Sequence, residues 1–282
     1  MRTAVREMIA RPLDGAEAVS NAAMGSFDIR TQDCIALLRD RADSSVDVIV
    51  TDPAYSGMNQ HMRFGHGRIV GSYGKPDNER WFHEFSDDPE TYRVFLAECA
   101  RVLRPDRHVY IMFDSFSMLS LGALVREYFD VKGVIVWDKV HLGMGHYFRR
   151  RHEQIVFASK GRRKVARRDL ADVWAVPRMH RAAYPTQKPV RLFEMMLEAS
   201  AEPGFTVCDP FCGSGSSAVA AVRLGCDFIG ADIDPRAVEM ARDRLTAVVA
   251  TGRDPLEPAR LRPGPTSSDP ISVGRRLPGL RS

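Results

Sequence analysis

The sequence predicts an α/β protein with a largely parallel sheet and helices on both faces of that sheet. Short apolar runs bounded by turn residues recur along the chain, and each is typical of a buried strand. These runs occupy residues 27–29, 45–50, 108–113, 133–137, 154–158, 205–209 and 226–231. Helical patterns lie between most of them, at residues 33–41, 89–103, 117–129, 189–200, 216–225 and 234–245. Regular alternation of strands and helices favours a parallel sheet.

One pair of strands departs from this alternation. The runs at 133–137 and 154–158 have no helical pattern between them. Consecutive strands without a crossover helix pair in antiparallel fashion. We therefore expect a mostly parallel sheet of seven strands with one antiparallel hairpin at an edge.

All of these patterns fall within residues 26–250, which we interpret as a single domain. Residues 1–25 lack periodicity and are expected to form a loose N-terminal arm. Residues 251–282 hold six Pro, four Gly and six Arg and are expected to be a disordered tail. The segment 56–88 is rich in Gly, His, Arg and Asn and too long for an idle connection, so it is predicted to be a functional mobile loop.

The composition excludes several classes of protein. The 282 residues are 44% hydrophobic and 27% charged, which rules out a mainly disordered chain or a disulfide-stapled miniprotein. No apolar stretch approaches the roughly 18 residues that a membrane span requires. The five cysteines form no Cys-x-x-Cys pair and are expected to be reduced thiols of a cytoplasmic protein. They are Cys34, Cys99, Cys208, Cys212 and Cys226.

The positive charge is concentrated in one part of the chain. Between His141 and Lys188 there are twelve Lys and Arg against three acids, a local balance of +9 within a net charge of +4. The remaining residues therefore carry a net charge of −5. A basic segment in an acidic remainder indicates a surface that binds a polyanion, although a solvated basic loop would show the same pattern.

Residues 206–235 indicate a nucleoside cofactor. A strand ending at Asp209 leads into Gly213 and Gly215 and then into a helix. Glycines let the backbone approach a ligand closely, and a helix N-terminus offers free N–H groups. The next strand ends at Asp232, where a carboxylate can accept both ribose hydroxyls. The pattern favours either NAD or S-adenosylmethionine (AdoMet).

Two alternatives stay open at this point. Asp234 competes with Asp232 for the ribose position. An NAD-dependent dehydrogenase would satisfy the glycine pattern, but that fold needs a second nucleotide-binding half, and only 48 residues follow Asp234.

A second motif ends another strand. The run at 45–50 delivers Asp52-Pro53-Ala54-Tyr55 to its carboxyl end, where open α/β sheets bind ligands. An acid, a rigid proline and an aromatic ring at that place suit a planar amine. A simple proline turn is the alternative.

These motifs resemble those of the AdoMet-dependent DNA amino-methyltransferases. Asp52-Pro-Ala-Tyr55 is similar to their Asp-Pro-Pro-Tyr motif, with Ala54 where Pro is usual. Asp209-Pro-Phe-Cys-Gly-Ser-Gly215 resembles their AdoMet motif of Phe-x-Gly-x-Gly type. The catalytic motif precedes the cofactor motif, as in the circularly permuted β group, and the resemblance implies the Rossmann-like methyltransferase fold.

Three further elements carry the same resemblance over residues 27–248. Tyr184-Pro-Thr-Gln-Lys-Pro189 resembles the family's Pro-Thr-Gln-Lys-Pro element, and Gln32-Asp33-Cys34 its N-terminal Gly-Asp-Cys element. Trp137-Asp-Lys139 with Arg151-His-Glu153 resembles the hairpin before the family's target-recognition segment.

The resemblance implies a role for each site residue. The Asp52 carboxylate and the Pro53 carbonyl would accept the two N–H groups of the target amine, and Tyr55 would stack on a base flipped out of the duplex. Asp33 would accept from the adenine amine of AdoMet, unless it is only a helix N-cap. The other residues implied for AdoMet are Thr186 and Lys188 at the methionine carboxylate, Asp209, Phe211, Gly213 and Gly215 around the methionine and sulfonium, and Asp232 at the ribose.

Double-stranded DNA is the implied partner, in the cytoplasm or on the nucleoid of a prokaryotic or phage-infected cell. The basic segment 160–184 and the loop 56–88 are expected to share DNA recognition. The residues proposed to contact DNA are Arg149, Arg150, Arg151, Arg162, Arg163, Lys164, Arg167 and Arg168. His61, His66 and His83 lack the spacing of zinc ligands, so no metal is expected. A homodimer is compatible with the resemblance, and the sequence does not decide whether a restriction endonuclease accompanies the protein.

The expected reaction is methylation of adenine N6, because the catalytic motif begins with Asp, whereas the related N4-cytosine enzymes more often begin theirs with Ser. The alternatives are N4-cytosine methylation, the same chemistry on RNA, and a catalytically silent protein that binds DNA and AdoMet, for which Ala54 is the warning sign.

Overall fold

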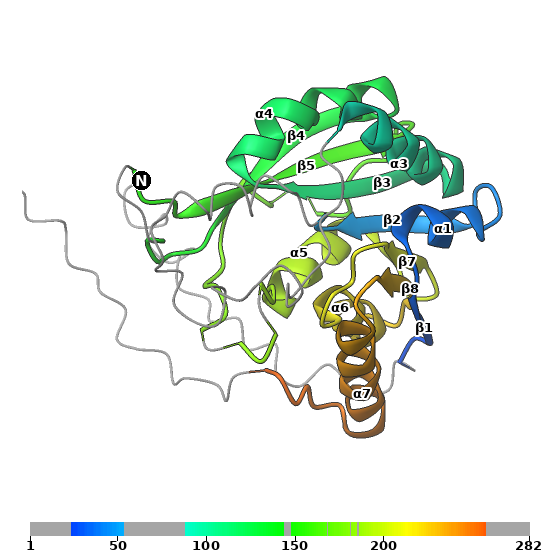
Figure 1. Cartoon of the computed structure of the whole chain (residues 1–282), viewed down its shortest axis with the longest axis vertical. Helices are drawn as coiled ribbons and strands as arrows, with labels where there is room; N and C mark the ends of the chain where they lie inside the picture. The colour runs from blue at the N-terminus through cyan, green and yellow to red at the C-terminus, as the bar shows by residue number, and fades with distance from the viewer. Residues whose placement is uncertain are drawn as a thin grey trace, which may run out of the picture.

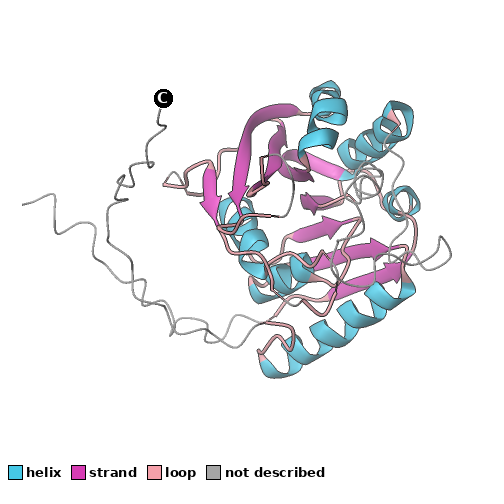
Figure 2. Ribbon diagram, turned by 60° about the vertical axis from the view of Figure 1, so that its left-hand side comes forward, coloured by secondary structure: helices cyan, strands magenta, loops and turns pink. Residues whose placement is uncertain are grey.

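The computed structural model describes residues 24–53, 88–143, 148–167, 169–180, 182–184 and 186–257. They form one eight-stranded sheet between two layers of helices (Figure 1, Figure 2). The strands are β1 (Phe27–Thr31), β2 (Val46–Thr51), β3 (Leu103–Phe113), β4 (Asp130–Asp138), β5 (His152–Lys160), β6 (Val173–Ala175), β7 (Thr206–Asp209) and β8 (Asp227–Asp232). Their order across the sheet is β1-β8-β7-β2-β3-β5-β4-β6.

The pairing confirms the mostly parallel α/β fold and corrects its details. Strands β1, β8, β7, β2 and β3 run parallel, and β5 runs antiparallel to both β3 and β4. The sheet has eight strands rather than the expected seven, because β6 adds to β4 in parallel. The β4–β5 hairpin therefore lies one strand in from the edge. A three-residue strand shows no periodicity in the sequence, and only its backbone pairing with β4 reveals it.

Helices cover both faces of the sheet, as expected. One face packs against α1 (Cys34–Arg39), α3 (Pro89–Val102), α4 (Ser115–Leu121) and the 3-10 helix η2 (Gly122–Glu127). The other packs against α5 (Val190–Ser200), α6 (Ser216–Arg223) and α7 (Pro235–Thr251). All six residues of β2 are buried because helices cover it on both sides. Aspartate side chains cap four of the helices at their N-termini: Asp33, Asp88, Asp114 and Asp234.

The domain boundary expected at residue 250 lies too early. Helix α7 ends at Thr251 with Gly252 as its C-cap, and Asp254 is buried against Arg244 of the same helix. Residues 251–257 thus belong to the folded domain. Residues 1–23 of the arm predicted at 1–25, almost all of the loop at 56–88 and the tail from 258 onward lie outside the described residues.

The topology places a crevice between β2 and β7. These two strands are parallel neighbours, but their chain connections leave in opposite directions. Strand β2 leads to β3 on one side, whereas β7 leads through α6 to β8 on the other. Open α/β sheets bind ligands at such a switch point, outside the carboxyl ends of the strands.

Candidate active site

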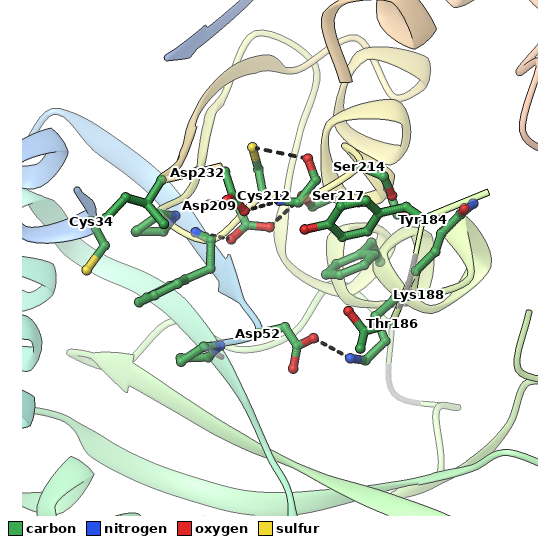
Figure 3. Close-up of a pocket in the computed structure, with 18 of the residues that line it drawn as sticks. Cys34, Asp52, Tyr184, Thr186, Lys188, Asp209, Cys212, Ser214, Ser217 and Asp232 are labelled. Atoms are coloured by element: carbon green, nitrogen blue, oxygen red, sulfur yellow. Dashed lines mark hydrogen bonds and ion pairs between the residues drawn. The ribbon is translucent and has the colours of Figure 1, made fainter. Parts of the chain in front are cut away.

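A cavity of about 570 Å³ opens at the carboxyl ends of β2, β7 and β8 (Figure 3). Both sequence motifs reach it, since Asp52 follows β2 and Asp209 ends β7. The segment that precedes α5 forms another wall through Tyr184, Thr186 and Lys188. The structure thus brings together three motifs that are far apart in the sequence.

The glycine turn after β7 depends on two left-handed backbone positions. Gly213 has φ +49° and Gly215 has φ +80°, which residues other than glycine adopt only with strain. The N–H of Gly213 donates to Asp232 at 3.0 Å, and this bond ties the turn to the end of β8. Gly215 is the N-cap of α6, and a Cβ there would lie 3.0 Å from the Cβ of Ala241 in α7.

Replacing Gly215 with Ala is therefore expected to destabilise the fold by about 1–3 kcal/mol, through backbone strain and an overlap with α7. It should also weaken AdoMet binding, because the turn forms the cavity wall. Urea unfolding and calorimetric titration with AdoMet measure the two effects.

Gly204→Ala is the matched control for this change. Gly204 has a similar φ of +84°, but no atom of the described residues lies within 4 Å of the point that a Cβ would occupy. The Gly204→Ala variant therefore reports the loss of unfolding free energy that the left-handed φ alone causes. Equal destabilisation by the two variants would show that the approach of α7 contributes nothing.

Asp209 is buried at the centre of the turn. Its carboxylate accepts hydrogen bonds from the Ser217 hydroxyl at 2.5 Å and from the N–H of Phe211 at 3.0 Å. Burial, with a further contribution from the negative charge of Asp52, raises the pKa of Asp209 to about 7. The Phe211 ring packs edge-on against Phe95 with 5.6 Å between ring centroids, so Phe211 joins the cavity to the core under α3.

Asp232 and Asp234 have different positions. Asp232 ends β8, lines the cavity and accepts from the N–H groups of Gly213 and Asp234. Burial raises its pKa. Asp234 instead caps α7 by accepting from the N–H of Arg236 at 3.0 Å and also pairs with the Arg236 guanidinium. The side chain that faces the cavity is therefore that of Asp232.

Asp33 also lines the cavity, but it has the alternative role considered for it. Its Oδ1 accepts from the N–H groups of Ile35 and Ala36 at 2.9 and 3.0 Å and caps α1. The cap fixes the carboxylate at the rim of the cavity.

The segment before α5 contributes two unusual residues. Thr186 adopts φ +63°, a left-handed conformation that is rare for a β-branched residue. Next to it, Gln187 is 7% exposed, and neither its Oε1 nor its Nε2 has a hydrogen-bond partner among the described residues. Unpaired buried amides are rare because each lost hydrogen bond is costly. A donor and an acceptor are therefore available at the wall of the cavity, and sequence reasoning did not single out Gln187.

Lys188, for which the resemblance implies contact with the methionine carboxylate, lies against two acids of the protein itself. Its ammonium group forms a close ion pair with Oδ2 of Asp52 (Figure 3) and lies 3.9 Å from Glu153 of β5. Lys139, just after β4, pairs with the same Glu153. Pro53 also lines the cavity, whereas Ala54 and Tyr55 lie outside the described residues.

Comparison with known proteins identifies the family. The family model N6_N4_Mtase, described as DNA methylase, matches residues 46–243. This chain belongs to that DNA methylase family. Two curated relatives agree: a type II methyltransferase, M2.DpnII, of Streptococcus pneumoniae is 30% identical over 76% of this chain and 88% of its own. M2.LlaDCHI of Lactococcus lactis subsp. cremoris is 28% identical over 76% and 87%.

Solved structures share the fold of this DNA methylase. The Thermus thermophilus protein TTHA0409 has a TM-score of 0.59 at 18% identity and covers 80% of this chain and 97% of its own. The M1.HpyAVI–SAM complex has a TM-score of 0.55 at 20% identity over 77% and 99%. The cytosine-N4-specific PvuII DNA methyltransferase has a TM-score of 0.59 at 13% identity over 81% and 93%. The cofactor of the family is AdoMet.

Strand β5 divides the basic segment of this DNA methylase into two groups. Arg149, Arg150 and Arg151 precede β5 on the cavity side, since β5 begins where β3 ends. Arg162, Arg163, Lys164 and Arg167 follow β5, beside the start of β3. Strand β5 has nine residues, so at about 3.3 Å per residue it separates the two groups by roughly 26 Å. Arg168 lies outside the described residues.

Several of these arginines are held by acids of the protein itself. Arg151 makes a two-point pair with Asp138 at 2.6 and 2.7 Å. Arg163 pairs with Glu202 at 2.5 Å, and Arg167 with Asp169 at 2.7 Å. The Arg150 guanidinium stacks over the ring of Phe116, 4.6 Å from its centroid, and Arg149 donates to the carbonyl of Gly143. Arg163 and Arg167 after β5 thus have acid partners, as Arg151 before β5 does, and neither of the two lines the cavity.

Other predictions concern the cysteines, metal ligands and membrane spans. All five cysteines are buried and unpaired, and burial raises the pKa of each thiol. In the described ranges no three His, Cys, Asp or Glu side chains cluster as metal ligands would, and no helix is long and apolar enough to cross a membrane. His61, His66 and His83 lie outside those ranges.

Proposed function

We propose that this protein transfers a methyl group from AdoMet to the exocyclic N6 of adenine in double-stranded DNA. The observation that carries the proposal is the place of Asp52. It follows a buried strand next to the glycine turn, in the same cavity. Lys188 pairs with Oδ2 of Asp52, whereas Oδ1 has no hydrogen-bond partner among the described residues.

An exocyclic amine is a weak nucleophile because its lone pair is delocalised into the ring. Two acceptors aimed at its N–H groups favour a more tetrahedral nitrogen and stabilise the positive charge that develops on it. The Asp52 carboxylate and the Pro53 carbonyl supply them in this proposal. The amine must first leave the base stack, so the nucleotide flips into the cavity, where Tyr55 would stack on it.

Two features of the cavity suit AdoMet. The unpaired amide of Gln187 offers a donor and an acceptor, which suits a ligand end that bears both an ammonium and a carboxylate. The buried Asp232 at the end of β8 suits a ribose diol. We assign Thr186, Asp209, Phe211, Gly213 and Gly215 to the rest of the cofactor, with Asp33 near the adenine. When bound, AdoMet supplies an electrophilic methyl group.

DNA contact is assigned to the arginines on the cavity side. Arg149, Arg150 and Arg151 are exposed and precede β5 close to the carboxyl ends of the parallel strands. Charges there can neutralise phosphates on either side of a flipped nucleotide. The group after β5 is not included, because it lies at the other end of that strand.

The proposed function is tested with methyl-labelled AdoMet and unmethylated duplex DNA of mixed sequence, followed by digestion to nucleosides and mass spectrometry. Label in N6-methyladenine is the expected result. Label in N4-methylcytosine would overturn the choice of base and keep the reaction class. Label in RNA but not in DNA, in a parallel incubation, would overturn the assignment of DNA as the substrate. No label in any nucleoside, with AdoMet binding intact, would contradict the enzyme assignment and favour a silent binding protein.

A further inference from the structure

Four charged side chains of alternating sign form a chain that ends at Asp52. Lys139 pairs with Glu153, Glu153 lies 3.9 Å from Lys188, and Lys188 pairs with Asp52. The four come from different segments: the end of β4, the start of β5, the segment before α5 and the end of β2. We call these residues the charge chain.

The charge chain is sheltered from solvent. Its side chains are only 15 to 26% exposed. Charges in such places are costly unless each is compensated by a partner. The interior members Glu153 and Lys188 each lie between two opposite charges, so no member can be removed without leaving a neighbour under-compensated. The backbone adds rigidity, since Glu153 is paired with Trp137 in the β4–β5 register and Lys139 N–H donates to the carbonyl of Arg151.

We propose that Lys188 and Glu153 are positioning residues for methyl transfer: Lys188 holds one oxygen of Asp52 so that the other is presented to the target amine, and Glu153, itself held by Lys139, holds Lys188 in place. This inference rests on the proposed function, in which Asp52 accepts from the amine. It differs from the role that the family resemblance implied for Lys188, which was to bind the methionine carboxylate of AdoMet.

The electrostatics of the site agree with this role. Burial raises the pKa of Asp52, the positive charge of Lys188 opposes that rise, and the negative charge of Glu153 adds to it. Lys139 also lowers the pKa of Asp52, and Asp209 is the other carboxylate close to it. Although burial works against it, Asp52 and Glu153 hold the pKa of Lys188 above its ordinary value. Lys188 thus favours the ionised form of Asp52, which is the form that accepts the amine.

The two members of the charge chain should therefore move the pH profile in opposite directions. Lys188→Met removes the main charge that lowers the pKa of Asp52, so the acid limb of kcat should move up by about one pH unit. Glu153→Gln removes a charge that raises the same pKa, so the acid limb should move down. Both variants should lose about 10- to 100-fold in kcat at the optimum, because Asp52 is less well oriented.

AdoMet binding separates this role from the cofactor role. Calorimetric titration of Lys188→Met should give a Kd for AdoMet within about threefold of the wild-type value. A residue that only positions Asp52 does not contribute to the binding of AdoMet in the ground state. Lys188→Arg keeps the positive charge and should recover part of kcat with a wild-type acid limb. Lys132→Met and Glu127→Gln are matched controls, because these residues form exposed pairs with Asp130 and Arg93 away from the cavity.

Two results would overturn the proposal. One is a rise of more than tenfold in the Kd for AdoMet with an unmoved acid limb in Lys188→Met, which would assign Lys188 to the cofactor. The other is an acid limb that moves in the same direction in Lys188→Met and Glu153→Gln, or that moves in neither variant. If Lys188→Met does not fold, Glu153→Gln and Lys188→Arg still decide the matter.

The proposal can also be tested when the proposed function fails. If the wild-type protein methylates no nucleoside, the function is wrong, but the link between Lys188 and Asp52 can still be measured. A ¹³C NMR titration of labelled aspartate carboxyls, with the Asp52 signal identified by its absence in Asp52→Asn, should show a higher Asp52 pKa in Lys188→Met than in wild type. An unchanged pKa would contradict the link itself.

Discussion

Replacing Asp52 with Asn is expected to lower kcat for methyl transfer by about 10²- to 10³-fold, the range found when one preorganised polar group is removed from an active site. The neutral amide cannot stabilise the positive charge that develops on the amine. Its NH₂ group also places donors where the substrate needs acceptors. The Kd for AdoMet should change much less, because Asp52 belongs to the catalytic motif after β2 and not to the glycine turn after β7.

Methyl incorporation at saturating AdoMet and DNA, together with calorimetric titration of AdoMet, measures both quantities. Asp130→Asn is the matched control. Asp130 begins β4 and, within the described residues, its side chain forms an exposed pair with Lys132, so the kcat of this variant should equal that of the wild type. In Asp52→Asn, Lys188 still lies 3.9 Å from Glu153, so the variant should stay folded. Thermal unfolding checks this. Retention of kcat in Asp52→Asn would contradict the assignment of Asp52.

Replacing Arg244 with Met is expected to cost about 3–5 kcal/mol in the free energy of unfolding, because it leaves a buried carboxylate without its partner. Arg244 and Asp254 are 2% and 7% exposed and form a two-point pair at 2.8 and 2.7 Å. The same guanidinium donates to the carbonyl of Ser214 at 2.9 Å and to the hydroxyl of Ser216 at 3.1 Å. The variant should therefore also weaken AdoMet binding, since both groups belong to the glycine turn.

A double variant separates stability from binding. In Arg244→Met with Asp254→Leu both charges are gone, and well-packed apolar replacements of buried pairs are often neutral. Stability should recover, whereas the Kd for AdoMet should stay raised, because the bonds to Ser214 and Ser216 are still missing. Recovery of both quantities would show that the turn does not need Arg244. The control Arg93→Met breaks an exposed pair with Glu127, so its free energy of unfolding should stay close to that of the wild type.

The same pair should appear in the pH dependence of unfolding. Although burial opposes it, Arg244 holds the pKa of Asp254 below its ordinary value. The folded protein therefore binds that proton less readily than the unfolded chain does, so the pair stabilises the protein above the unfolded pKa of about 4 and the contribution is lost as the pH falls further. Urea unfolding at pH 3 to 7 should show this loss in the wild type and not in Asp254→Asn.

The surroundings of Arg244 show what a sequence pattern can predict and what it cannot. A charged residue within the apolar stripe of the helix at 235–251, between Ala241 and Val248, signals a buried charge that needs a partner. Residues beyond 250 have the composition of a tail because they are rich in Pro, Gly and Arg. Asp254 is the partner, but a single Asp in a polar segment carries no periodic signal, and only the fold brings it back onto α7.

Local patterns were enough to predict the alternation of strands and helices and the two motifs at strand ends, and the family resemblance implied that both motifs serve one site. Apolar periodicity selects strands and helices, and parallel strands share their carboxyl edge. Three features came only from the folded chain: Asp232 and not Asp234 faces the cavity, Lys188 pairs with Asp52, and β5 divides the basic segment between two ends of the sheet. Each of these depends on the direction of a side chain or strand relative to residues more than a hundred positions away or across the sheet, and packing of the whole chain sets that direction.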